Sequence, residues 1–358
     1  MTVKLFFPHH YGAARTGFIA AAEAAELGIT SRLLGGIKAA DGGPLFLDTA
    51  WAGRRDARRA LLLISGTHGV EGYFGSGVQT GLLRQGLAAQ VPQDCKLVLL
   101  HALNPYGFSF DRRANEANAD INRNFVDHAH PPANTEYDVL AEAAAPKDIS
   151  PAAFAAANSV LSAFSAEHGS FALQAALSRG QYTHPDGIYY GGAKLSWSLL
   201  MLKDVLQEEL KDVEELTVID FHTGLGRYGA AEIITEAEPG SAAYERAHKI
   251  WGSSLRSTAN GQSLSAHLHG TIDSAMAAWM GTRALSFVAL EVGTLSVSKV
   301  FEALRKDNWL SCHAPADFPH RAQIKRQIRD AFYPDHEDWK ETVFAHGKTA
   351  VEMALAAL

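Results

Sequence analysis

A histidine and a glutamate three residues apart form a pair that could bind a metal ion. They are His68 and Glu71, in the segment GTHGVEG at residues 66–72. Zinc accepts imidazole nitrogen and carboxylate oxygen, and a catalytic zinc keeps three protein ligands and one open position. The glycines of this segment would let the loop turn both side chains toward one ion. The alternative is a capped loop with a surface glutamate, and the pair alone does not decide between them.

A third ligand would have to come from a distant part of the chain, and His222 is the best-placed candidate. It lies in the segment DFHTG at residues 220–224, directly after the apolar run 216–219. Asp220 could orient a ligand by a hydrogen bond. The sequence contains no HExxH motif, which excludes the helix-borne zinc peptidase pattern. The chain has sixteen histidines, so a single histidine means little by itself. His222 becomes a candidate ligand because its motif follows the His68 and Glu71 motif along the chain.

Arginines and asparagines gather in the loop between residues 104 and 125, which has little apolar content. A guanidinium offers a two-pronged fork to a carboxylate, and an arginine near a metal can stabilise an oxyanion. The candidates are Arg112, Arg113 and Arg123. The alternative is a surface loop held by Asx turns and salt bridges. Without a neighbouring metal motif, the surface loop would be the better interpretation.

Short apolar runs precede several of these polar residues. They lie at residues 61–64, 97–100, 216–219 and 287–290, with a fifth candidate at 232–235. Each run predicts a buried strand, because it is short and is followed by polar or glycine residues. The polar residues that follow or end these runs include His68, His101, His222 and Glu291. In open α/β sheets sites form beyond the carboxyl ends of the strands, so we expect a site there.

Helical patterns separate the predicted strands. They cover residues 14–26, 135–179 (broken near Pro151), 194–212, 241–257, 296–306 and 337–357. This alternation predicts an α/β fold whose mixed, mostly parallel sheet has helices on both faces. With no repeat and no linker, residues 1–358 are expected to form a single catalytic domain. The stretch of about 127–190 has few strand signals, and we expect a helical insertion that could cover the site.

Composition bounds the functional class. The chain has 358 residues, a net charge of −7 and scattered basic residues, so it lacks the basic footprint of a nucleic-acid-binding protein. No apolar run reaches the roughly 18 residues of a membrane span. Cys95 and Cys312 are too few for a disulfide framework and are expected to be reduced. The N-terminus lacks a signal-peptide pattern, and a cytoplasmic protein is the default expectation. The oligomeric state is left open.

The motifs together resemble the zinc carboxypeptidase family in order and spacing. They are HGVEG, NPYGF, RRANEANADINRNF, DFHTG and a late glutamate at the end of a strand. The chain looks closest to a bacterial branch of this family that is known mainly as a domain of unknown function. Residues 291–294 (EVGT), 303–310 and 331–340 are similar to that branch. The resemblance covers roughly residues 1–345 and implies a zinc carboxypeptidase-like fold.

The resemblance also implies roles for individual residues. The expected ligands of one zinc ion per chain are His68, Glu71 and His222. Glu291 matches the general acid/base, and Arg113 matches the arginine that stabilises the oxyanion. Asn122 and Arg123 match the pair that grips the substrate's terminal carboxylate. Arg112 competes with Arg113, because the two are adjacent and either could face the substrate.

The implied activity is zinc-dependent hydrolysis of an amide next to a free carboxylate, on a peptide or a small molecule. A close alternative is an N-acyl amino acid deacylase of the aspartoacylase and succinylglutamate desuccinylase type. A metal-free binding protein on the same scaffold would lack a ligand or the base, and neither is missing. A two-metal aminopeptidase would need a bridging carboxylate and more ligands. Manganese or cobalt could replace zinc.

One feature of the family finds no firm counterpart in this sequence, and one polar segment receives no role. Tyr228 is only a loose candidate for the family's mobile substrate tyrosine. The segment 262–273, with His267, His269 and Asp273, could line the pocket or form a polar loop, and it receives no role. These departures bear on the substrate rather than on the chemistry.

Overall fold

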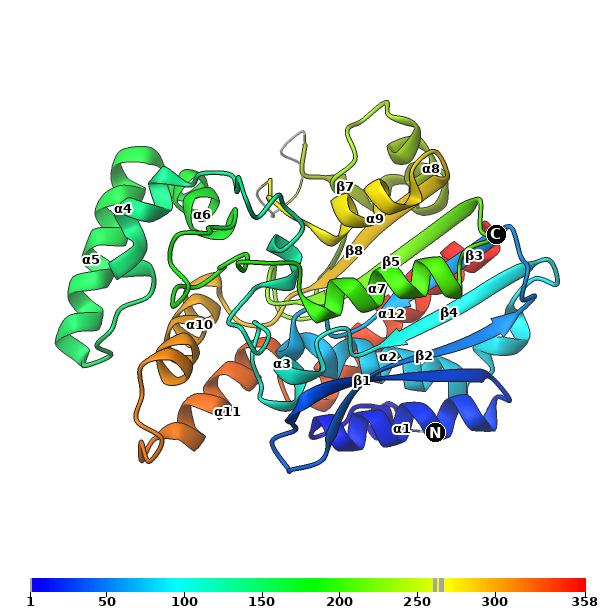
Figure 1. The fold of residues 1–358 in the computed structure, drawn as a ribbon, viewed down its shortest axis with the longest axis horizontal. Helices are drawn as coiled ribbons and strands as arrows, with labels where there is room; N and C mark the ends of the chain where they lie inside the picture. The colour runs from blue at the N-terminus through cyan, green and yellow to red at the C-terminus, as the bar shows by residue number, and fades with distance from the viewer. Residues whose placement is uncertain (1, 260–262, 264–266) are drawn as a thin grey trace.

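The computed structural model describes residues 2–259, 263 and 267–358, and a mixed sheet of eight strands lies at the centre of this part of the chain (Figure 1). In spatial order the strands are β1 (Gly28–Lys38), β2 (Pro44–Gly53), β4 (Cys95–His101), β3 (Arg59–Ile64), β5 (Glu215–Thr223), β8 (Ala284–Val292), β6 (Ala231–Thr235) and β7 (Leu255–Ser257). The four central strands run parallel, β1 and β2 extend one side antiparallel, and β6 pairs antiparallel with β8. The expected mixed, mostly parallel α/β sheet is confirmed.

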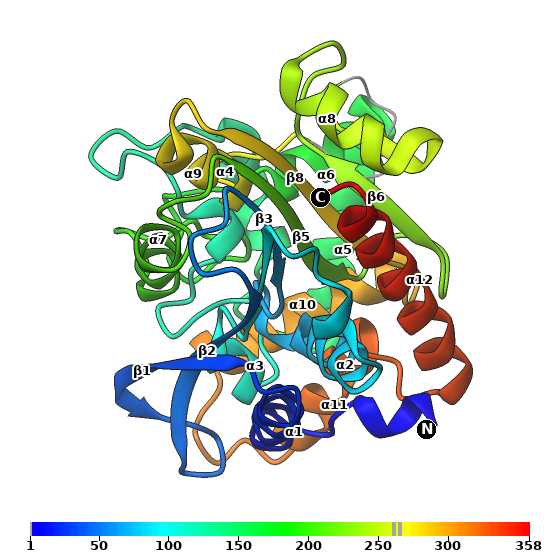
Figure 2. The ribbon, with the colours of Figure 1, turned by 90° about the vertical axis from the view of Figure 1, so that its right-hand side faces the viewer.

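Helices cover both faces of the sheet (Figures 1 and 2). One face packs against α1 (Tyr11–Ala24), α2 (Gly72–Arg84), α8 (Ala242–Trp251) and α12 (Glu337–Ala356), and the other against α7 (Trp197–Glu208) and α9 (Ile272–Met280). Along β3, Leu61 and Leu63 enter the first core, whereas Leu62 and Ile64 enter the second. Because successive strand residues point to opposite faces, a strand covered on both sides must be apolar throughout.

The remaining helices lie beyond the carboxyl ends of the central strands (Figure 1). They are α3 (Pro105–Ser109), α4 (Thr135–Ala144), α5 (Pro151–His168), α6 (Ser170–Ser178), α10 (Val297–Cys312) and α11 (Arg321–Phe332). Helices α4 to α6 share a hydrophobic cluster of their own, and α10 and α11 pack together over Val70. Short 3-10 turns complete the described structure: η1 (Val3–Phe6), η2 (Gly69–Glu71), η3 (Leu87–Gln90), η4 (Ile121–Arg123) and η5 (Gly252–Ser254).

Strand β3 is the point at which the order of the sheet reverses. The chain leaves β3 to form β4 on one side and later forms β5 on the other side. Loops that follow such a strand diverge and leave a crevice at the carboxyl edge of the sheet. The loop after β3 contains His68 and Glu71, so the topology places this pair where a site is expected.

Several expected elements differ from the structure. The helix expected over 241–257 ends at Trp251, because Gly252 has φ +54° and the chain continues as η5 and β7. The helical stretch 135–179 consists of three helices. The sequence patterns did not predict β1, β2, β7, α2, α9 or α11. Among the described residues, no helix combines the length and apolar character needed to cross a membrane.

Candidate metal centre and active site

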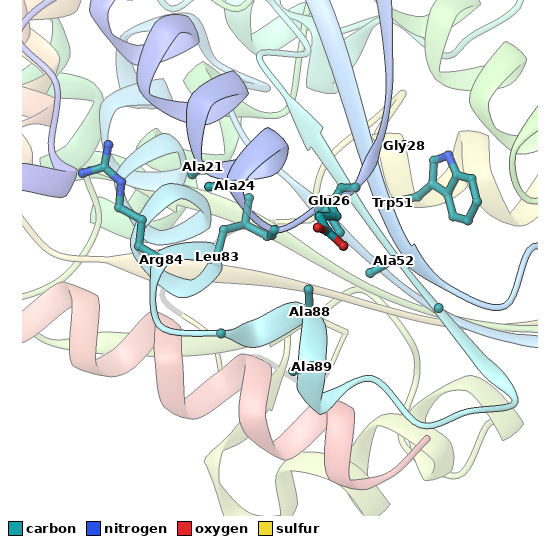
Figure 3. A pocket seen from close by; sticks show the side chains of 14 residues that line it. Ala21, Ala24, Glu26, Gly28, Trp51, Ala52, Leu83, Arg84, Ala88 and Ala89 are labelled. Carbon is teal, nitrogen blue, oxygen red and sulfur yellow. The ribbon is translucent and has the colours of Figure 1, made fainter.

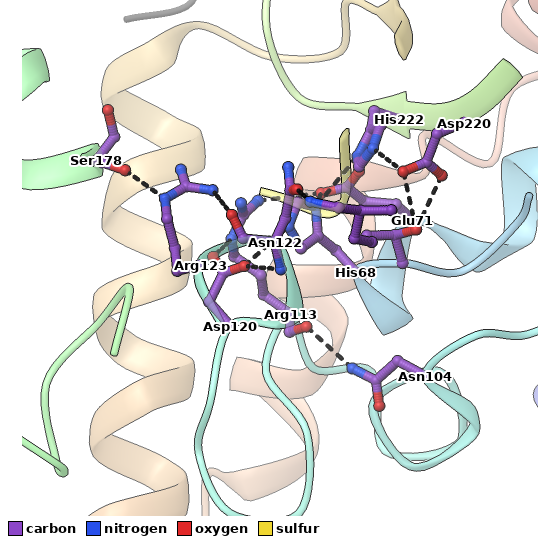
Figure 4. Close-up of polar contacts among 12 residues, drawn as sticks. His68, Glu71, Asn104, Arg113, Asp120, Asn122, Arg123, Ser178, Asp220 and His222 are labelled. Atoms are coloured by element: carbon purple, nitrogen blue, oxygen red, sulfur yellow. Dashed lines mark hydrogen bonds and ion pairs between the residues drawn. The ribbon is translucent and has the colours of Figure 1, made fainter. Parts of the chain in front are cut away.

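Three side chains meet at the carboxyl ends of β3 and β5 (Figure 4). His68 Nδ1 lies 2.9 Å from Glu71 Oε1, and His222 Nδ1 lies 3.0 Å from Glu71 Oε2. The two Nδ1 atoms are 3.2 Å apart, and all three side chains are buried. Ligand atoms about 2.0–2.2 Å from a tetrahedral zinc lie roughly 3.3–3.6 Å from one another. The spacing of the three groups is therefore close to that of a zinc ligand set.

The outer nitrogens of both histidines contact carboxylates. His68 Nε2 lies 3.2 Å from Asp120 Oδ1, and His222 Nε2 lies 2.8 Å from Asp220 Oδ2. A carboxylate only accepts, so Asp120 and Asp220 favour a proton on each Nε2, while both Nδ1 atoms face the Glu71 carboxylate. With the protons on Nε2, the two Nδ1 atoms, 3.2 Å apart, would present lone pairs that a cation could share with Glu71. The donor set therefore fits a metal ion, and the carboxylates would fix both rings as ligands.

The loop after β3 brings His68 and Glu71 together through a single tight turn. In η2 the Glu71 N–H donates to the His68 carbonyl at 3.1 Å, which returns the glutamate to the histidine. A Cβ on Gly69 would lie 1.9 Å from the carbonyl carbon of Gly107, so only glycine permits this close approach. The Val70 N–H donates to the carbonyl of Arg112 and ties the turn to the arginine loop.

Strands β5 and β8 place Glu291 beside the ligands. Asp220 and His222 are two residues apart on β5 and therefore share one face, and Glu291 is the register partner of His222 on β8. The Leu225 N–H donates to Glu291 Oε1 at 2.9 Å. Burial, and then the negative charge of Glu71, raise the pKa of Glu291 to about 8. A carboxyl group with such a pKa can take up and release a proton near neutral pH.

The structure distinguishes the two adjacent arginines. Arg113 donates from Nε to Asp120 Oδ2 at 2.9 Å and from Nη1 to Glu71 Oε1 at 3.2 Å. Burial alone would lower the pKa of Arg113, but the charges of Asp120 and Glu71 raise it. Arg112 donates instead to Asp307 on α10 at 3.4 Å. Arg112 also donates to Asn118 at 2.6 Å and has no hydrogen bond to a ligand residue within the described residues, and its expected substrate contact stays a prediction.

Asn122 and Arg123 lie where η4 meets α6 and α9. Asn122 Oδ1 accepts from the N–H of Ile272 at 2.9 Å, at the start of α9. Arg123 is buried, and it donates from Nε to the Ser178 carbonyl and from Nη1 to the Asn122 carbonyl, both at 2.7 Å. Burial lowers the pKa of Arg123. Among the hydrogen bonds of described residues, none uses Arg123 Nη2, which leaves this nitrogen for a ligand.

Asp120 is a site residue to which the sequence analysis gave no role. Its carboxylate contacts both His68 and Arg113, and it also accepts from the Asn122 N–H at 3.0 Å. Burial alone would raise the pKa of Asp120, but the charges of Arg113 and His68 hold it well below its ordinary value. Its position between Arg113 and Asn122 in the motif was a signal, but the sequence does not show which group it contacts.

Tyr228 lies away from the ligand cluster, whereas the segment of His267, His269 and Asp273 lies beside the η4 turn, where the Phe125 N–H donates to the Gly270 carbonyl. Tyr228 is 45% exposed, and its hydroxyl donates to Asp338 at 3.2 Å rather than to a ligand residue. His267 Nδ1 lies 3.5 Å from Glu236, and Asp273 is in the first turn of α9. Residues 262 and 264–266 of the same segment lie outside the described residues.

A wide pocket of about 750 Å³ lies at the opposite edge of the sheet (Figure 3). Its walls include Ala21, Trp51, Gly53 and Leu83. Gly53 pairs with Lys96 near the start of β4, so this pocket lies at the amino ends of the central strands. Among the described residues that line this pocket there is no group of nucleophiles or metal ligands.

The fold and the site define an α/β protein with a buried His-Glu-His cluster at the carboxyl edge of a mixed sheet. Residues 7–346 match the family described as "Protein of unknown function (DUF2817)", and the chain belongs to this family. The expected membership in a branch known as a domain of unknown function is thereby confirmed. No protein with a curated description matches the sequence.

Solved structures similar to this chain include metallo-carboxypeptidases. Bovine thrombin-activatable fibrinolysis inhibitor, in complex with tick carboxypeptidase inhibitor, is 11% identical, with a TM-score of 0.44 over 95% of this chain and 97% of that chain. A metallo-carboxypeptidase from Pseudomonas aeruginosa, in complex with (2-guanidinoethylmercapto)succinic acid, is 13% identical, with a TM-score of 0.42 over 93% and 68%. An aspartoacylase family protein from Mesorhizobium loti is 12% identical, with a TM-score of 0.39 over 81% and 68%.

Proposed function

We propose that this protein is a zinc-dependent hydrolase that cleaves an amide bond next to a free carboxylate. The observation that carries the proposal is the convergence of His68 Nδ1, His222 Nδ1 and the Glu71 carboxylate in one buried cluster. Glu291, a carboxyl group with a raised pKa, is the register partner of His222 on the next strand. Such a combination supports hydrolysis better than simple metal storage, because storage needs no acid/base group.

The metal ligands in this proposal are His68, Glu71 and His222. A zinc ion held by these residues would polarise the scissile carbonyl and lower the pKa of a water molecule toward about 7. Asp120 and Asp220 would accept from the outer nitrogens of the histidines and so leave each Nδ1 to bind the ion.

Glu291 is proposed to transfer the protons of the reaction. As the carboxylate, it would take a proton from the attacking water and then donate it to the leaving nitrogen. Burial and the neighbouring charge of Glu71 raise the pKa of Glu291 to about 8, and the positive charge of a bound zinc ion would favour the carboxylate that accepts the first proton. The Leu225 N–H holds one carboxyl oxygen and limits the rotation of the side chain.

The arginines are proposed to bind the two negative charges of the reacting substrate. Arg113 contacts Glu71, so its guanidinium lies beside the ligands, where an oxyanion would develop. Arg123 and Asn122 would hold the substrate carboxylate, because Arg123 keeps Nη2 available while its other nitrogens are fixed. Fixing the carboxylate would place the neighbouring amide near the ligands and reduce the entropic cost of reaction.

A panel of paired substrates tests this function. The zinc-loaded protein is incubated with dipeptides and N-acyl amino acids, and with the same compounds carrying a C-terminal carboxamide. We expect hydrolysis of compounds with the free carboxylate and little hydrolysis of their carboxamides. Preference for N-acyl amino acids over dipeptides would identify the deacylase alternative. Equal hydrolysis of acids and carboxamides would contradict the proposed carboxylate contact.

The Glu291→Gln variant is the control for this panel. Glutamine keeps the size of the side chain but cannot transfer a proton, so turnover should fall by about 100-fold or more. Zinc content, measured by mass spectrometry, should remain that of the wild type. Retained turnover in Glu291→Gln would remove Glu291 from the mechanism.

A further inference from the structure

Tyr189 has an unusual backbone conformation in the loop between α6 and α7. Its φ is +55°, in the left-handed region that favours glycine. A bulky residue in this region is a genuine outlier, because its Cβ crowds the neighbouring carbonyl. Such strain persists where the surrounding structure holds the residue in place, and it is concentrated at functional sites. The contacts of the Tyr189 side chain should therefore explain why this conformation persists.

The loop around Tyr189 is firmly held by its own hydrogen bonds. The side chain of Gln181 donates to the carbonyls of His184 and Ile188 and accepts from the N–H groups of Thr183 and His184. The Asp120 N–H donates to the carbonyl of the following residue, residue 190, at 2.7 Å. The strained residue is thus fixed on one side by the loop and on the other by the candidate site.

The ring of Tyr189 lies against both arginines of the candidate site. The Cζ atom of Arg113 is 5.2 Å from the ring centroid, and the Cζ atom of Arg123 is 5.7 Å from it. A guanidinium within about 6 Å of an aromatic face is attracted by the negative face of the ring. One ring therefore contacts the arginine proposed for the oxyanion and the arginine proposed for the carboxylate.

Both guanidiniums keep one nitrogen available beside this ring. Arg113 uses Nε and Nη1 for Asp120 and Glu71, and Arg123 uses the same two atoms for backbone carbonyls. Neither Nη2 atom donates a hydrogen bond to a described residue. The Tyr189 hydroxyl likewise makes no hydrogen bond with a described residue.

We propose that Tyr189 is a positioning residue whose ring sets the spacing of the Arg113 and Arg123 guanidiniums. The two cations would otherwise repel each other and move apart, and an aromatic face attracts both. The fixed spacing would match the distance between the scissile carbonyl and the carboxylate of the substrate. This inference rests on the proposed function for its consequence in catalysis, but the arginine spacing is a property of the protein itself.

A purely structural role for Tyr189 is the competing explanation. The side chain packs against the cluster of α4 to α6 and against the cluster formed by Val70, α10 and α11. If packing were its whole role, its loss would lower stability without a specific effect on the arginines. The adjacent Tyr190 provides a matched control, because it is also a tyrosine, is 6% exposed and makes no cation–π contact with an arginine of the described residues.

The kinetic test compares Tyr189→Phe, Tyr189→Leu and Tyr190→Leu. Phenylalanine keeps the ring, and we expect Tyr189→Phe to retain both kcat and KM. Leucine removes the ring, so kcat should fall and KM should rise, each by about 3- to 30-fold, since each arginine loses one cation–π contact. Equal losses in Tyr189→Phe and Tyr189→Leu would assign the role to the hydroxyl and overturn the proposal.

A second readout needs no substrate. In ¹⁵N–¹H spectra of the zinc-loaded protein, the Nε–H signals of Arg113 and Arg123 should carry ring-current shifts that Tyr189→Phe keeps and Tyr189→Leu loses. Succinate, a dicarboxylate probe, should bind Tyr189→Leu more weakly than Tyr190→Leu. Unchanged arginine signals, or equal weakening in both leucine variants, would overturn the proposal. Intact arginine signals in a wild type without hydrolytic activity would refute the proposed function alone.

Discussion

At the residue scale, the candidate site depends on which ring nitrogen of each histidine contacts an aspartate and which faces Glu71. His68 and His222 both direct Nε2 to a carboxylate, and this leaves both Nδ1 atoms for the ligand cluster. The carboxylates belong to Asp120 and Asp220, which lie on different elements. The candidate metal site therefore consists of two matched histidine–carboxylate pairs that converge on Glu71.

The first prediction concerns these two carboxylates. Asp120→Asn and Asp220→Asn should each weaken zinc binding by about 10- to 100-fold, because an amide orients and polarises the histidine less well. Titration of zinc against a competing chelator measures the affinity. Asp307→Asn is the control, since Asp307 is a buried aspartate that contacts Arg112 and Lys325. An equal loss of affinity in Asp307→Asn would show that the effect is not specific to the histidine partners.

The second prediction separates the adjacent arginines. Arg113→Gln should lower kcat/KM by about 100-fold, because one donor to the developing oxyanion is lost. Arg112→Gln should leave kcat/KM near the wild-type value and lower the melting temperature instead, because a buried contact with Asp307 is lost. Steady-state kinetics and thermal unfolding of both variants provide the measurement. A larger kinetic effect in Arg112→Gln would reverse the assignment.

The sequence allowed the ligand cluster to be predicted, but not the orientation of its neighbours. His68 and Glu71 were predictable because a short glycine-rich loop leaves few ways to place them. The choice between Arg112 and Arg113 was not predictable, since one residue of difference in an irregular loop reverses the direction of a side chain. The contacts of Asp120 and Tyr189 depend on tertiary packing between distant segments, which local patterns do not describe.

At the element scale, the central strands were predictable and the edge strands were not. Strand β4 is buried at every position, so it appears in the sequence as a continuous apolar run. Strand β1 is largely exposed or half-exposed and has no such run. Helix α2 was missed because it contains Gly72, Gly75, Gly77 and Gly81, and glycine disfavours helices. A Cβ on Gly75 would lie 2.6 Å from the Ser65 Cβ, so close packing explains this glycine.

The third prediction concerns His101, which joins three elements. His101 is the last residue of β4, and its Nε2 atom is hydrogen-bonded to the Ser76 hydroxyl of α2 at 3.0 Å. Its ring stacks on Phe18 of α1, with 4.6 Å between the ring centroids. Burial lowers the pKa of His101 to about 4. The unfolded chain therefore binds more protons between pH 6.5 and 4, and stability must fall as the pH falls through this window.

Urea unfolding at pH 7 and pH 5 measures this effect. The wild type should lose about 2 kcal/mol more stability between these pH values than His101→Gln, which cannot titrate. Glutamine can keep a hydrogen bond to Ser76, so the comparison isolates the charge. The same pH dependence in both proteins would show that His101 does not contribute to acid unfolding.

At the scale of the whole molecule, two of the places that tie the helical stretch α4–α6 to the rest of the chain involve a buried arginine. One is the candidate site, where the Ser178 carbonyl at the end of α6 accepts from Arg123. The other is Arg305 of α10, which donates to the Ala143 carbonyl of α4 and to Asn158 of α5. We propose that these connections make the stretch part of a single domain rather than an independent unit.

The fourth prediction tests that connection. Arg305 is 1% exposed, and its Cζ atom lies 4.0 Å from the ring centroid of Phe154. Arg305→Ala should destabilise the protein by about 3 kcal/mol, because buried acceptors lose their donor. Limited proteolysis should then cut first within residues 145–150. Lys299→Ala, an exposed position on the same helix, is the control. Unchanged proteolysis of Arg305→Ala would contradict a single cooperative domain.

The central claim is that the buried His-Glu-His cluster binds zinc, and metal content tests it most directly. The protein is purified without added metal and without a nickel column, and the metal is measured by mass spectrometry beside a His68→Ala, His222→Ala double variant. We expect about one zinc ion per chain in the wild type and none in the double variant. A wild type that contains no metal, even after zinc is offered, would contradict the hydrolase proposal and favour a metal-free binding protein.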